Sequence, residues 1–514
     1  MLFTLALMPI LIILILMIGL RWGAARAGAA GYLSALLIAI LFFGSGPTLL
    51  AFAHTRAFLL SLDVLLIIWA AFLLYRVADE AGAIRTIGLA LPHLTADKGM
   101  QALIIGWVFA SFLQGVGGFG VPVAVIAPLL VGLGFAPLQA VIIPSLGHGW
   151  AVTFGSLGSS FQALIASSGL PGEVLAPDSA LFLGISGLIV GLMVAHAAGG
   201  QKVMVRLVAP VLILGIVMGT AQYLLAVARL WNIAAFGGGL AGLLVGIPLA
   251  SRFRGQAGER EALALSTVAV ALSGYIILIV IILGVQLIPE VREYLGQIVL
   301  RVEFPEVVTT RGFVTPAGPG RTIPIFRHPG AILTYSSLIA YFIYQAAGLY
   351  KPKAAGRIIK GTFTRVMSSS VSIASMVAMT VIMEHAGMVE TLAQGLANSM
   401  GTAFPLVAPW IGALGAFMTG SNTNSNVVFG ALQLRTSELL GYQAALILAG
   451  QTAGAALASV MAPTKVVVGA STAGMAGQEG DIMRKILTYT GLLVLLISFL
   501  TMGSVLLDNN GLWW

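Results

Sequence analysis

The stretch "FMTGSNTNSNVVFG" at residues 417–430 decides how the rest of the sequence is interpreted. It places two serines, two threonines and three asparagines in the middle of a chain that is 59% hydrophobic. A lipid bilayer cannot hydrate such groups, and each one left unsatisfied there costs roughly several kcal/mol. We therefore expect these side chains to have a function.

Composition indicates a polytopic membrane protein. Only 9% of the residues are charged, against about 25% in soluble domains. The chain has no cysteine, and its six histidines are scattered without metal-ligand or haem spacing. We expect no disulfide, no metal site and no cofactor. The net charge of +8 comes from Lys and Arg in short links between apolar segments, as membrane orientation requires, so no nucleic-acid partner is expected.

Apolar runs of spanning length, about 17 to 25 residues, predict an all-α fold with about 12 transmembrane helices. The runs cover residues 2–20, 29–51, 57–77, 137–168, 178–198, 207–228, 232–250, 263–287, 329–349, 366–386, 441–469 and 486–506. Two further apolar stretches, 99–134 and 402–436, have Gly-rich or Asn-rich centres. We interpret these two as re-entrant hairpins.

The distribution of Lys and Arg supports this topology. If both hairpins fold back, the short basic links all fall on one side of the membrane, which the positive-inside rule makes the cytoplasmic side. Both termini then lie outside, the first hairpin enters from inside and the second from outside. The long link at 288–328 lies outside, and its β-branched residues and turn signals predict a small ribbon.

Matches at a common offset indicate an internal repeat within a single transporter domain, 1–514. Trp107 and Trp410, Gly117 and Gly420, and Gly147 and Gly450 are each 303 residues apart. A first repeat at 29–170 and a second at 329–506 would be inverted relative to each other, because their hairpins enter from opposite sides. The alternative is chance matching of common small residues. Inverted repeats with broken membrane segments are typical of secondary transporters, not enzymes, with the substrate near the midplane.

The first hairpin tip, "FLQGVGGFGVPVAV" at 112–125, presents glycines and a proline around a turn. Glycine permits close backbone approach, and proline suits the first turn of the following helix. The tip would present backbone N–H groups at a helix N-terminus, which can bind a carboxylate. The candidate binding residues are Gly117, Gly118, Phe119 and Gly120. Membrane helices also use glycine for packing alone.

At the aligned position, the second tip offers side-chain amides and hydroxyls as well. The candidate binding residues are Ser421, Asn422, Thr423, Asn424, Ser425 and Asn426. The alternative is that these residues only cap the hairpin arms and satisfy the turn, which Ser, Thr and Asn do well.

Two further segments are too interrupted by small or helix-breaking residues to be plain spans. They are "PSLGHGWAVTFGSLGSS" at 144–160 and "AGQTAGAALASVMAPTK" at 449–465. Gln451 and Thr452 in the second would line the binding site. His148 in the first is a candidate proton-coupling group, because imidazole changes charge near physiological pH; it could equally be a histidine hydrogen-bonded within the helix bundle.

Few other ionisable groups lie within the apolar segments, where charges are costly and often functional. Asp63 and Glu384 are the other proton-coupling candidates, although Glu384 could equally be solvated at the outer interface beside His385. Lys465 follows Pro463 in the second broken segment. It could pair with a substrate carboxylate or with the inner lipid surface.

At these segments the sequence resembles the bacterial L-lactate permease family. The resemblance extends over most of the chain and is carried by "GVGGFGVPVAV" at 115–125, "VGLGFAPLQA" at 131–140, "TFGSLG" at 153–158 and "FMTGSNTNSNVVFGALQ" at 417–433. It implies proton-coupled transport of lactate, and commonly glycolate, across the bacterial inner membrane. More distantly, Ser421-Asn422-Thr423 resembles the hairpin signature of the sodium-coupled dicarboxylate transporters.

The chain departs from the family pattern at both tips. Gln114 stands before the first tip where relatives usually carry Glu, and Asn422 stands in the second where they usually carry Asp. The pattern also differs beside His148 and at Ala462-Pro463-Thr464. The two missing carboxylates are groups that could carry a proton or ligate a cation, so the resemblance predicts the fold more firmly than the coupling ion.

The sequence therefore predicts a multi-pass secondary transporter that imports L-lactate, with D-lactate or glycolate, by proton symport. The carboxylate would dock between the two tips, and the 2-hydroxyl would meet Gln451 or His148. The alternative is a sodium-coupled transporter of another small organic anion. A remote alternative is an intramembrane enzyme or a respiratory subunit. Oligomeric state stays open.

Overall fold

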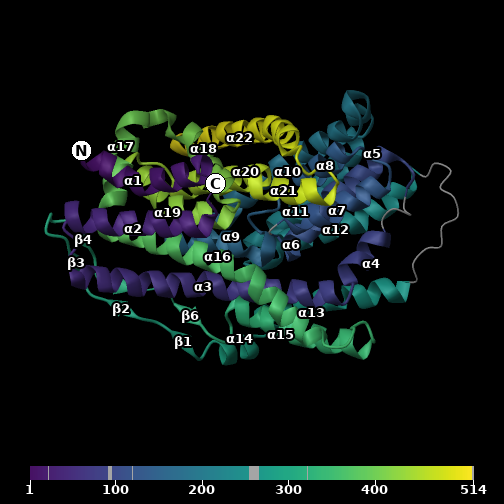
Figure 1. Cartoon of the computed structure of the whole chain (residues 1–514), viewed down its shortest axis with the longest axis horizontal. Helices are drawn as coiled ribbons and strands as arrows, with labels where there is room; N and C mark the ends of the chain where they lie inside the picture. The colour runs from purple at the N-terminus through teal and green to yellow at the C-terminus, as the bar shows by residue number, and fades with distance from the viewer. Residues whose placement is uncertain (21, 91–94, 119, 254–264, 321, 512–514) are drawn as a thin grey trace.

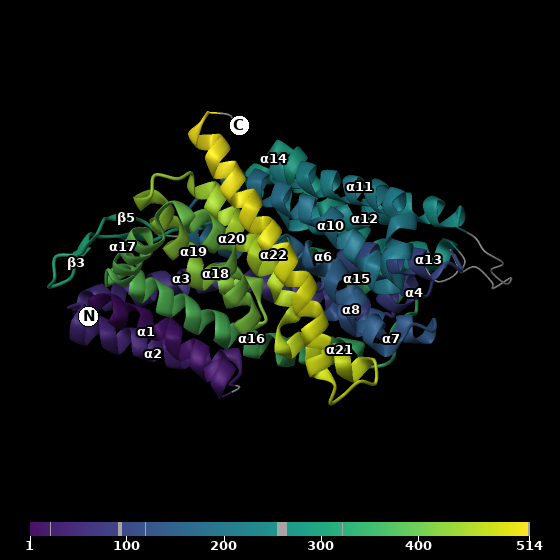
Figure 2. The same ribbon diagram turned by 90° about the horizontal axis from the view of Figure 1, so that it is seen from above.

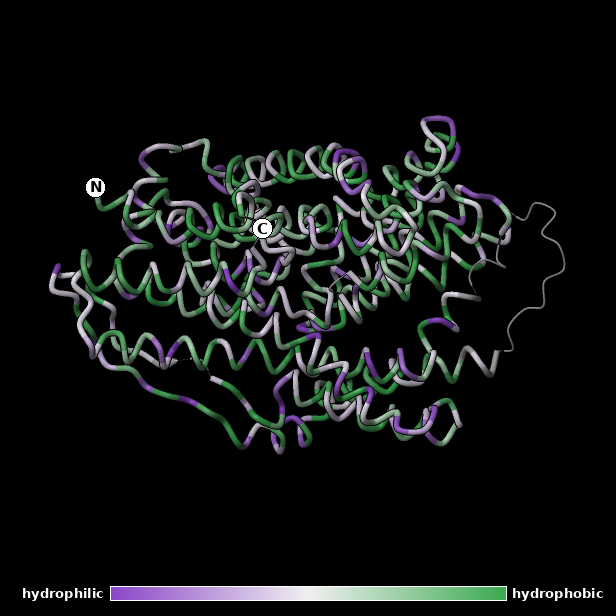
Figure 3. Tube along the Cα trace, in the orientation of Figure 1, coloured by the Kyte–Doolittle hydropathy of each residue, from purple (hydrophilic) through white to green (hydrophobic). Residues whose placement is uncertain are grey.

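The computed structural model describes residues 1–20, 22–90, 95–118, 120–253, 265–320 and 322–511. These residues form an assembly of long helices, with short strands that run from its left end along its lower edge (Figure 1). The all-helical polytopic fold class predicted from the sequence is confirmed. Hydrophobic residues dominate the helical trace in Figure 3, as expected of a chain whose solvent is lipid.

The helices are as follows. In the first half they are α1 Leu2–Leu14, α2 Ala24–Phe42, α3 Pro47–Glu80, α4 Ala83–Ala90, α5 Lys98–Gln101, α6 Ala110–Val116, α7 Val121–Gly132, α8 Pro137–Gly149, α9 Gly155–Ser168, α10 Gly172–Arg206, α11 Val208–Val227 and α12 Trp231–Ser251. In the second half they are α13 Leu265–Leu287, α14 Pro289–Leu295, α15 Pro329–Ala346, α16 Ala354–His385, α17 Met388–Met400, α18 Phe404–Thr419, α19 Asn422–Leu439, α20 Ala444–Ala458, α21 Pro463–Thr472 and α22 Glu479–Asn509.

Within the described ranges, ten helices are long and apolar enough to cross a membrane by length and composition. Their boundaries differ from the predicted runs in places. The predicted span 29–51 is interrupted, because Gly44 at φ +71° and Pro47 at the start of α3 end one helix and begin the next. The apolar N-terminal helix, Leu2–Met17, is shorter than a full span, whereas the arm Lys98–Val116 of the first hairpin is long enough to be one.

The link between α14 and α15 contains the predicted ribbon. Its antiparallel strand pairs are β1 (Val299–Leu300) with β6 (Ile323–Pro324), β2 (Glu303–Phe304) with β5 (Gly318–Pro319), and β3 (Val307–Val308) with β4 (Val314–Thr315). The ribbon is attached to the helices at the α2–α3 turn, where the backbone N–H of Thr310 donates to the carbonyl of Gly44 at 3.0 Å.

The two halves of the chain are interwoven. α3 packs against α15 and α16, and α2 packs against α16, so the long helices of each half contact those of the other (Figures 1 and 2). The hairpins exchange partners in the same way: α19 packs on α9, and α7 packs on α21. Two inverted copies would pack in this reciprocal way, and the repeat itself stays a prediction.

Candidate functional site

Both predicted breaks in the membrane segments are present. Between α8 and α9 the chain passes through a loop at 150–154, and Ser156 and Leu157 then adopt left-handed φ values of +48° and +55°. Between α20 and α21 a 3-10 turn over Ser459–Met461 leads to an extended Ala462. Because such backbone leaves peptide groups outside regular helix, it is tolerated at membrane depth only where protein or a ligand satisfies those groups.

The first hairpin tip is packed closely against the first break. α6 ends at Val116, Gly118 and Gly120 have φ of +51° and +86°, and α7 begins at Val121. A Cβ added to Gly118 would lie 1.7 Å from Oγ of Ser156, so only glycine fits there. Gln114 is buried beside this contact and its Oε1 has no hydrogen-bond partner in the described part of the chain. The candidate Phe119 lies outside the described residues.

The second tip begins α19 with a side-chain cap. Gly420, at φ +70°, ends α18, and the Oγ of Ser421 accepts a hydrogen bond from the backbone N–H of Asn424 at 3.2 Å. The capping interpretation is therefore correct for Ser421. It does not account for Asn422 and Asn426, which are 2% and 0% exposed and whose side chains bond to residues outside α19.

Asn422 and Asn426 connect this tip to both breaks. The Nδ2 of Asn422 donates to Oγ1 of Thr153 at 3.1 Å, and the Nδ2 of Asn426 donates to Oγ1 of Thr452 at 2.9 Å. Thr153 and Thr452, one from each broken segment, lie 3.2 Å apart through their hydroxyls. The hydroxyl of Thr423 meets that of Ser160 on α9 at 3.0 Å. Three discontinuous segments thus converge on one polar cluster.

The same cluster holds acceptors that nothing satisfies. The Oδ1 atoms of Asn422, Asn424 and Asn426 are buried and have no hydrogen-bond partner among the described residues. A buried unsatisfied acceptor costs about 1–3 kcal/mol, and several within five residues call for a ligand or water. A ligand carrying a hydroxyl or another donor would satisfy one of them.

The polar side-chain atoms of Gln451 and Ser425 are used in contacts between helices and are not free to bind a ligand. The Nε2 of Gln451 donates to Oγ of Ser425 at 3.1 Å, while its Oε1 accepts from Nε2 of Gln433 at 3.0 Å. Ser425 itself donates to the carbonyl of Gly412 at 2.7 Å. With both amide atoms of Gln451 used, these residues join α18, α19 and α20 in the described conformation.

His148 and Lys465 lie at the breaks and not in the amide cluster. The Nδ1 of His148 donates to the carbonyl of Pro144 at 2.6 Å, which leaves Nε2 as a buried acceptor with no partner in the described structure. Lys465 on α21 donates to Oγ of Ser459 at 3.1 Å, and α21 contacts α8, the helix that carries His148. The structure therefore brings these two candidates near each other.

Asp63 is buried in the middle of α3 and is held by groups from two other elements. Its Oδ1 lies 2.8 Å from Nε2 of His328, and its Oδ2 accepts from Nε2 of Gln162 on α9 at 3.1 Å. The Nδ1 of His328 accepts from the backbone N–H of Gly330, so the proton of the neutral ring is on Nε2 and faces Asp63. Glu384, by contrast, is exposed near the end of α16.

Sequence reasoning missed several residues of the site. Thr153 and Ser160 lie within the quoted broken segment, and their hydroxyls were a usable signal there. His328 and Gln162 gave no signal, because one precedes a helix after the long loop and the other lies within an apolar run. Their proximity to Asp63 depends on three segments that are far apart in the chain.

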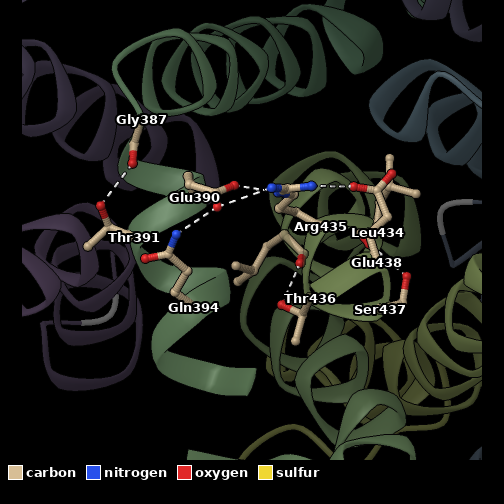
Figure 4. Close-up of polar contacts among 10 residues, drawn as sticks. Gly387, Glu390, Thr391, Gln394, Leu434, Arg435, Thr436, Ser437 and Glu438 are labelled. Atoms are coloured by element: carbon tan, nitrogen blue, oxygen red, sulfur yellow. Dashed lines mark hydrogen bonds and ion pairs between the residues drawn. The ribbon is translucent and has the colours of Figure 1, made fainter. Parts of the chain in front are cut away.

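The far end of α19 is anchored to α17 by an ion-pair cluster (Figure 4). Arg435 pairs with Glu390 on α17 and, at 2.9 Å, with Glu438 one turn along its own helix. Gln394 donates to Glu390 at 2.8 Å. This contact fixes the returning arm of the second hairpin to a helix that also packs on α1.

Comparison with known proteins identifies the family of this chain. Residues 3–507 match the family described as L-lactate permease. The L-lactate permease of Bacillus subtilis (strain 168) is 26% identical over 543 residues, covering 96% of this chain and 94% of that protein. Glycolate permease GlcA of Escherichia coli (strain K12) is 26% identical, covering 97% and 94%. The crystal structure of the Alcanivorax borkumensis YdaH transporter is 13% identical, with a TM-score of 0.49, covering 87% of this chain and 85% of that one.

The first tip provides a test of the packing described above. Gly118→Ala should lower the apparent Tm more than Gly120→Ala, although both positions have positive φ and share a strain of about 1–2 kcal/mol. Only at Gly118 does the added Cβ meet another atom, since nothing lies within 4 Å of a Cβ on Gly120. Thermal unfolding of the detergent-purified variants measures the difference. Equal shifts would show that the tip is not seated against Ser156.

Proposed function

Because the chain belongs to the L-lactate permease family, we propose that it is a secondary transporter that imports L-lactate, and also D-lactate or glycolate, across the bacterial inner membrane by proton symport. The observation that carries this proposal is the buried cluster of neutral amides and hydroxyls at the N-terminus of α19. Family members are permeases, so the intramembrane enzyme and respiratory subunit are set aside.

The chemistry of the cluster suits a small 2-hydroxy monocarboxylate. The first-turn N–H groups of α19 lack intrahelical acceptors and favour an anion, and the Nδ2 groups of Asn422 and Asn426 add donors. The unsatisfied Oδ1 atoms can accept from the substrate hydroxyl. The side chains in hydrogen-bond contact with Asn422, Thr423 and Asn426 in the described structure are neutral, which disfavours a substrate with two negative charges.

The transport cycle follows from how the hairpins are held. In the described conformation Asn422 and Asn426 use their donors on Thr153 and Thr452, so substrate must replace those contacts when it binds. The exchange would loosen α19 from the two broken segments that carry Thr153 and Thr452 and allow the hairpins to move against the scaffold of α2, α3, α15 and α16. Inverted repeats supply the two related positions that alternating access requires.

The proton carrier in this proposal is Asp63. His328 and Gln162 hold its carboxylate by hydrogen bonds, and a buried carboxylate loses its desolvation cost when it takes up a proton. Gln162 is on α9, two residues from Ser160, which contacts Thr423 at the tip. Protonation of Asp63 would therefore reach the substrate cluster through one helix, and no carboxylate at position 422 is needed.

Sodium coupling is the second candidate. The unsatisfied amide oxygens of Asn422, Asn424 and Asn426 are hard ligands of the kind that alkali and alkaline-earth cations accept. In that alternative the cation would occupy the tip beside another small organic anion, and Asp63 would have only a structural role.

Uptake into proteoliposomes under separate gradients decides between the two. An inward proton gradient should drive accumulation of labelled L-lactate and glycolate, with little uptake of a dicarboxylate, and a sodium gradient at equal internal and external pH should have no effect. Accumulation driven by sodium alone would support the sodium-coupled alternative. No uptake of any monocarboxylate would contradict the proposal itself.

Substitutions within the second tip test the binding residues. Asn426→Ala removes a donor to Thr452 and an unsatisfied acceptor, and should raise KM for lactate about tenfold or more, equivalent to about 1.4 kcal/mol. Ser437→Ala is the matched control, because it removes a buried hydroxyl at the far end of the same helix, which donates to the carbonyl of Leu434 at 2.6 Å, and it should leave KM unchanged. If the two variants behaved alike, or Asn426→Ala matched wild type, the assignment of the cluster would be wrong.

A separate pair of variants tests the proton carrier. Asp63→Asn should abolish accumulation against a gradient while lactate exchange across the membrane continues, because exchange moves no net proton. Wild-type uptake should rise as external pH falls, and the variant should lose this dependence. His54→Gln, at a partly buried histidine bonded to Tyr32, serves as the control. Proton-driven accumulation by Asp63→Asn would exclude Asp63 as the carrier.

A further inference from the structure

A cavity of about 400 Å³ lies outside the amide cluster, at the end of the molecule that carries the strand ribbon. Its walls come from α3, the end of α9, the end of α16 and the ribbon. The polar groups that line it are Arg56, Ser167, Ser168, Thr322, Glu384 and His385. In the orientation predicted from the Lys and Arg distribution, this is the extracellular end. The volume lies within the usual range for small-molecule sites, about 300–1,000 Å³.

Arg56 is held at the cavity by the ribbon. Its guanidinium carbon lies 4.6 Å from the ring centroid of Phe304 on β2, a cation–π contact. Phe304 is itself fixed, since its ring packs edge-on against Phe52 and a Cβ on Gly320 would lie 2.5 Å from it. The Nε of Arg56 is buried and has no hydrogen-bond partner in the described ranges. A planar donor group with unused N–H is suited to a carboxylate.

His385 supplies an acceptor in the same cavity. Its Nδ1 donates to the carbonyl of Val381 at 2.8 Å, so Nε2 carries the lone pair in the neutral ring. That Nε2 is buried and unpartnered among the described residues. A ligand that offers both a carboxylate and a hydroxyl would satisfy Arg56 with the first and His385 with the second.

The cavity adjoins the amide cluster through one contact. Ser167, which lines the cavity, donates to the backbone carbonyl of Asn426 at 2.8 Å. A Cβ on Gly430 would lie 2.2 Å from the same hydroxyl, so α9 and α19 touch closely here. Separation of these two helices would join the cavity to the tip.

We propose that this cavity is an extracellular vestibule in which Arg56 and His385 capture the 2-hydroxy monocarboxylate before it passes between α9 and α19 to the cluster. The inference rests on the proposed function and deepens it. It also gives the 288–328 ribbon a role, because Phe304 positions the capturing arginine. Glu384 lines the same cavity as Arg56, and when ionised it would weaken the attraction of Arg56 for the anion, so that the anion can move on.

Removing the positive charge of the vestibule and removing its negative charge should change the KM for L-lactate in opposite directions. Arg56→Gln should raise KM for L-lactate uptake about tenfold with little change in the maximal rate, Arg56→Lys should recover part of the loss, and Glu384→Gln should lower KM. Arg301→Gln is the matched control: it removes an exposed arginine of the same ribbon, paired with Glu303 at 2.7 Å, and should leave KM unchanged. His385→Phe should raise KM for lactate more than for propionate, which has no hydroxyl.

A second measurement distinguishes failure of the vestibule from failure of the proposed transport function. It is the rise in Tm that sodium L-lactate produces on binding to the purified protein. If wild type takes up lactate and Arg56→Gln matches Arg301→Gln in KM, the vestibule is wrong and the function stands. If wild type takes up no lactate but lactate raises its Tm and not that of Arg56→Gln, the vestibule stands and the function fails. No uptake and no shift overturn both. Should Arg56→Gln not fold, Arg56→Lys and Glu384→Gln decide: unchanged KM in both overturns the vestibule.

Discussion

The architecture depends on one constraint: polar groups buried at membrane depth must be satisfied by protein or by ligand. Asn422 and Asn426 meet it by donating to Thr153 and Thr452, and in doing so they join the second hairpin to both broken segments. Non-helical backbone of the kind found in the broken segments is tolerated at membrane depth only where it is buried in protein or lines a polar cavity. The Oδ1 atoms of these asparagines have no partner among the described residues, and they are the atoms to which the proposal assigns the substrate.

α9 is the helix that contacts the amide cluster, Asp63 and the outer cavity. It carries Ser160 at the tip, Gln162 at Asp63 and Ser167 at the outer cavity, all within eight residues of one helix. A shift of α9 relative to α19 would therefore alter the amide cluster, the contacts of Asp63 and the outer cavity together. Such shared mechanical dependence is the physical basis on which ion and substrate movement can be coupled.

Apolar runs, the Gly-rich and Asn-rich centres, and the β-branched residues and turn signals of the long link were enough to predict the helical class, both hairpin turns, both breaks and the ribbon. Local pattern was sufficient there because each feature is encoded by adjacent residues, such as Gly118 and Gly120 at a turn. Local pattern singled out Asp63 but could not predict its partners, because His328 and Gln162 come close to Asp63 only through tertiary packing. It also overestimated Gln451, since the Gln433 and Ser425 contacts that use its amide depend on the packing of three helices.

The central claim, that the tip of α19 binds the substrate, is tested most directly by protection from a thiol reagent. The chain has no native cysteine, so Ser421→Cys would carry a single thiol at the tip and Ser399→Cys a single exposed thiol on α17. Saturating L-lactate should slow modification of the first severalfold and leave the second unchanged. Equal modification rates at the tip with and without lactate, in protein that transports it, would contradict the account.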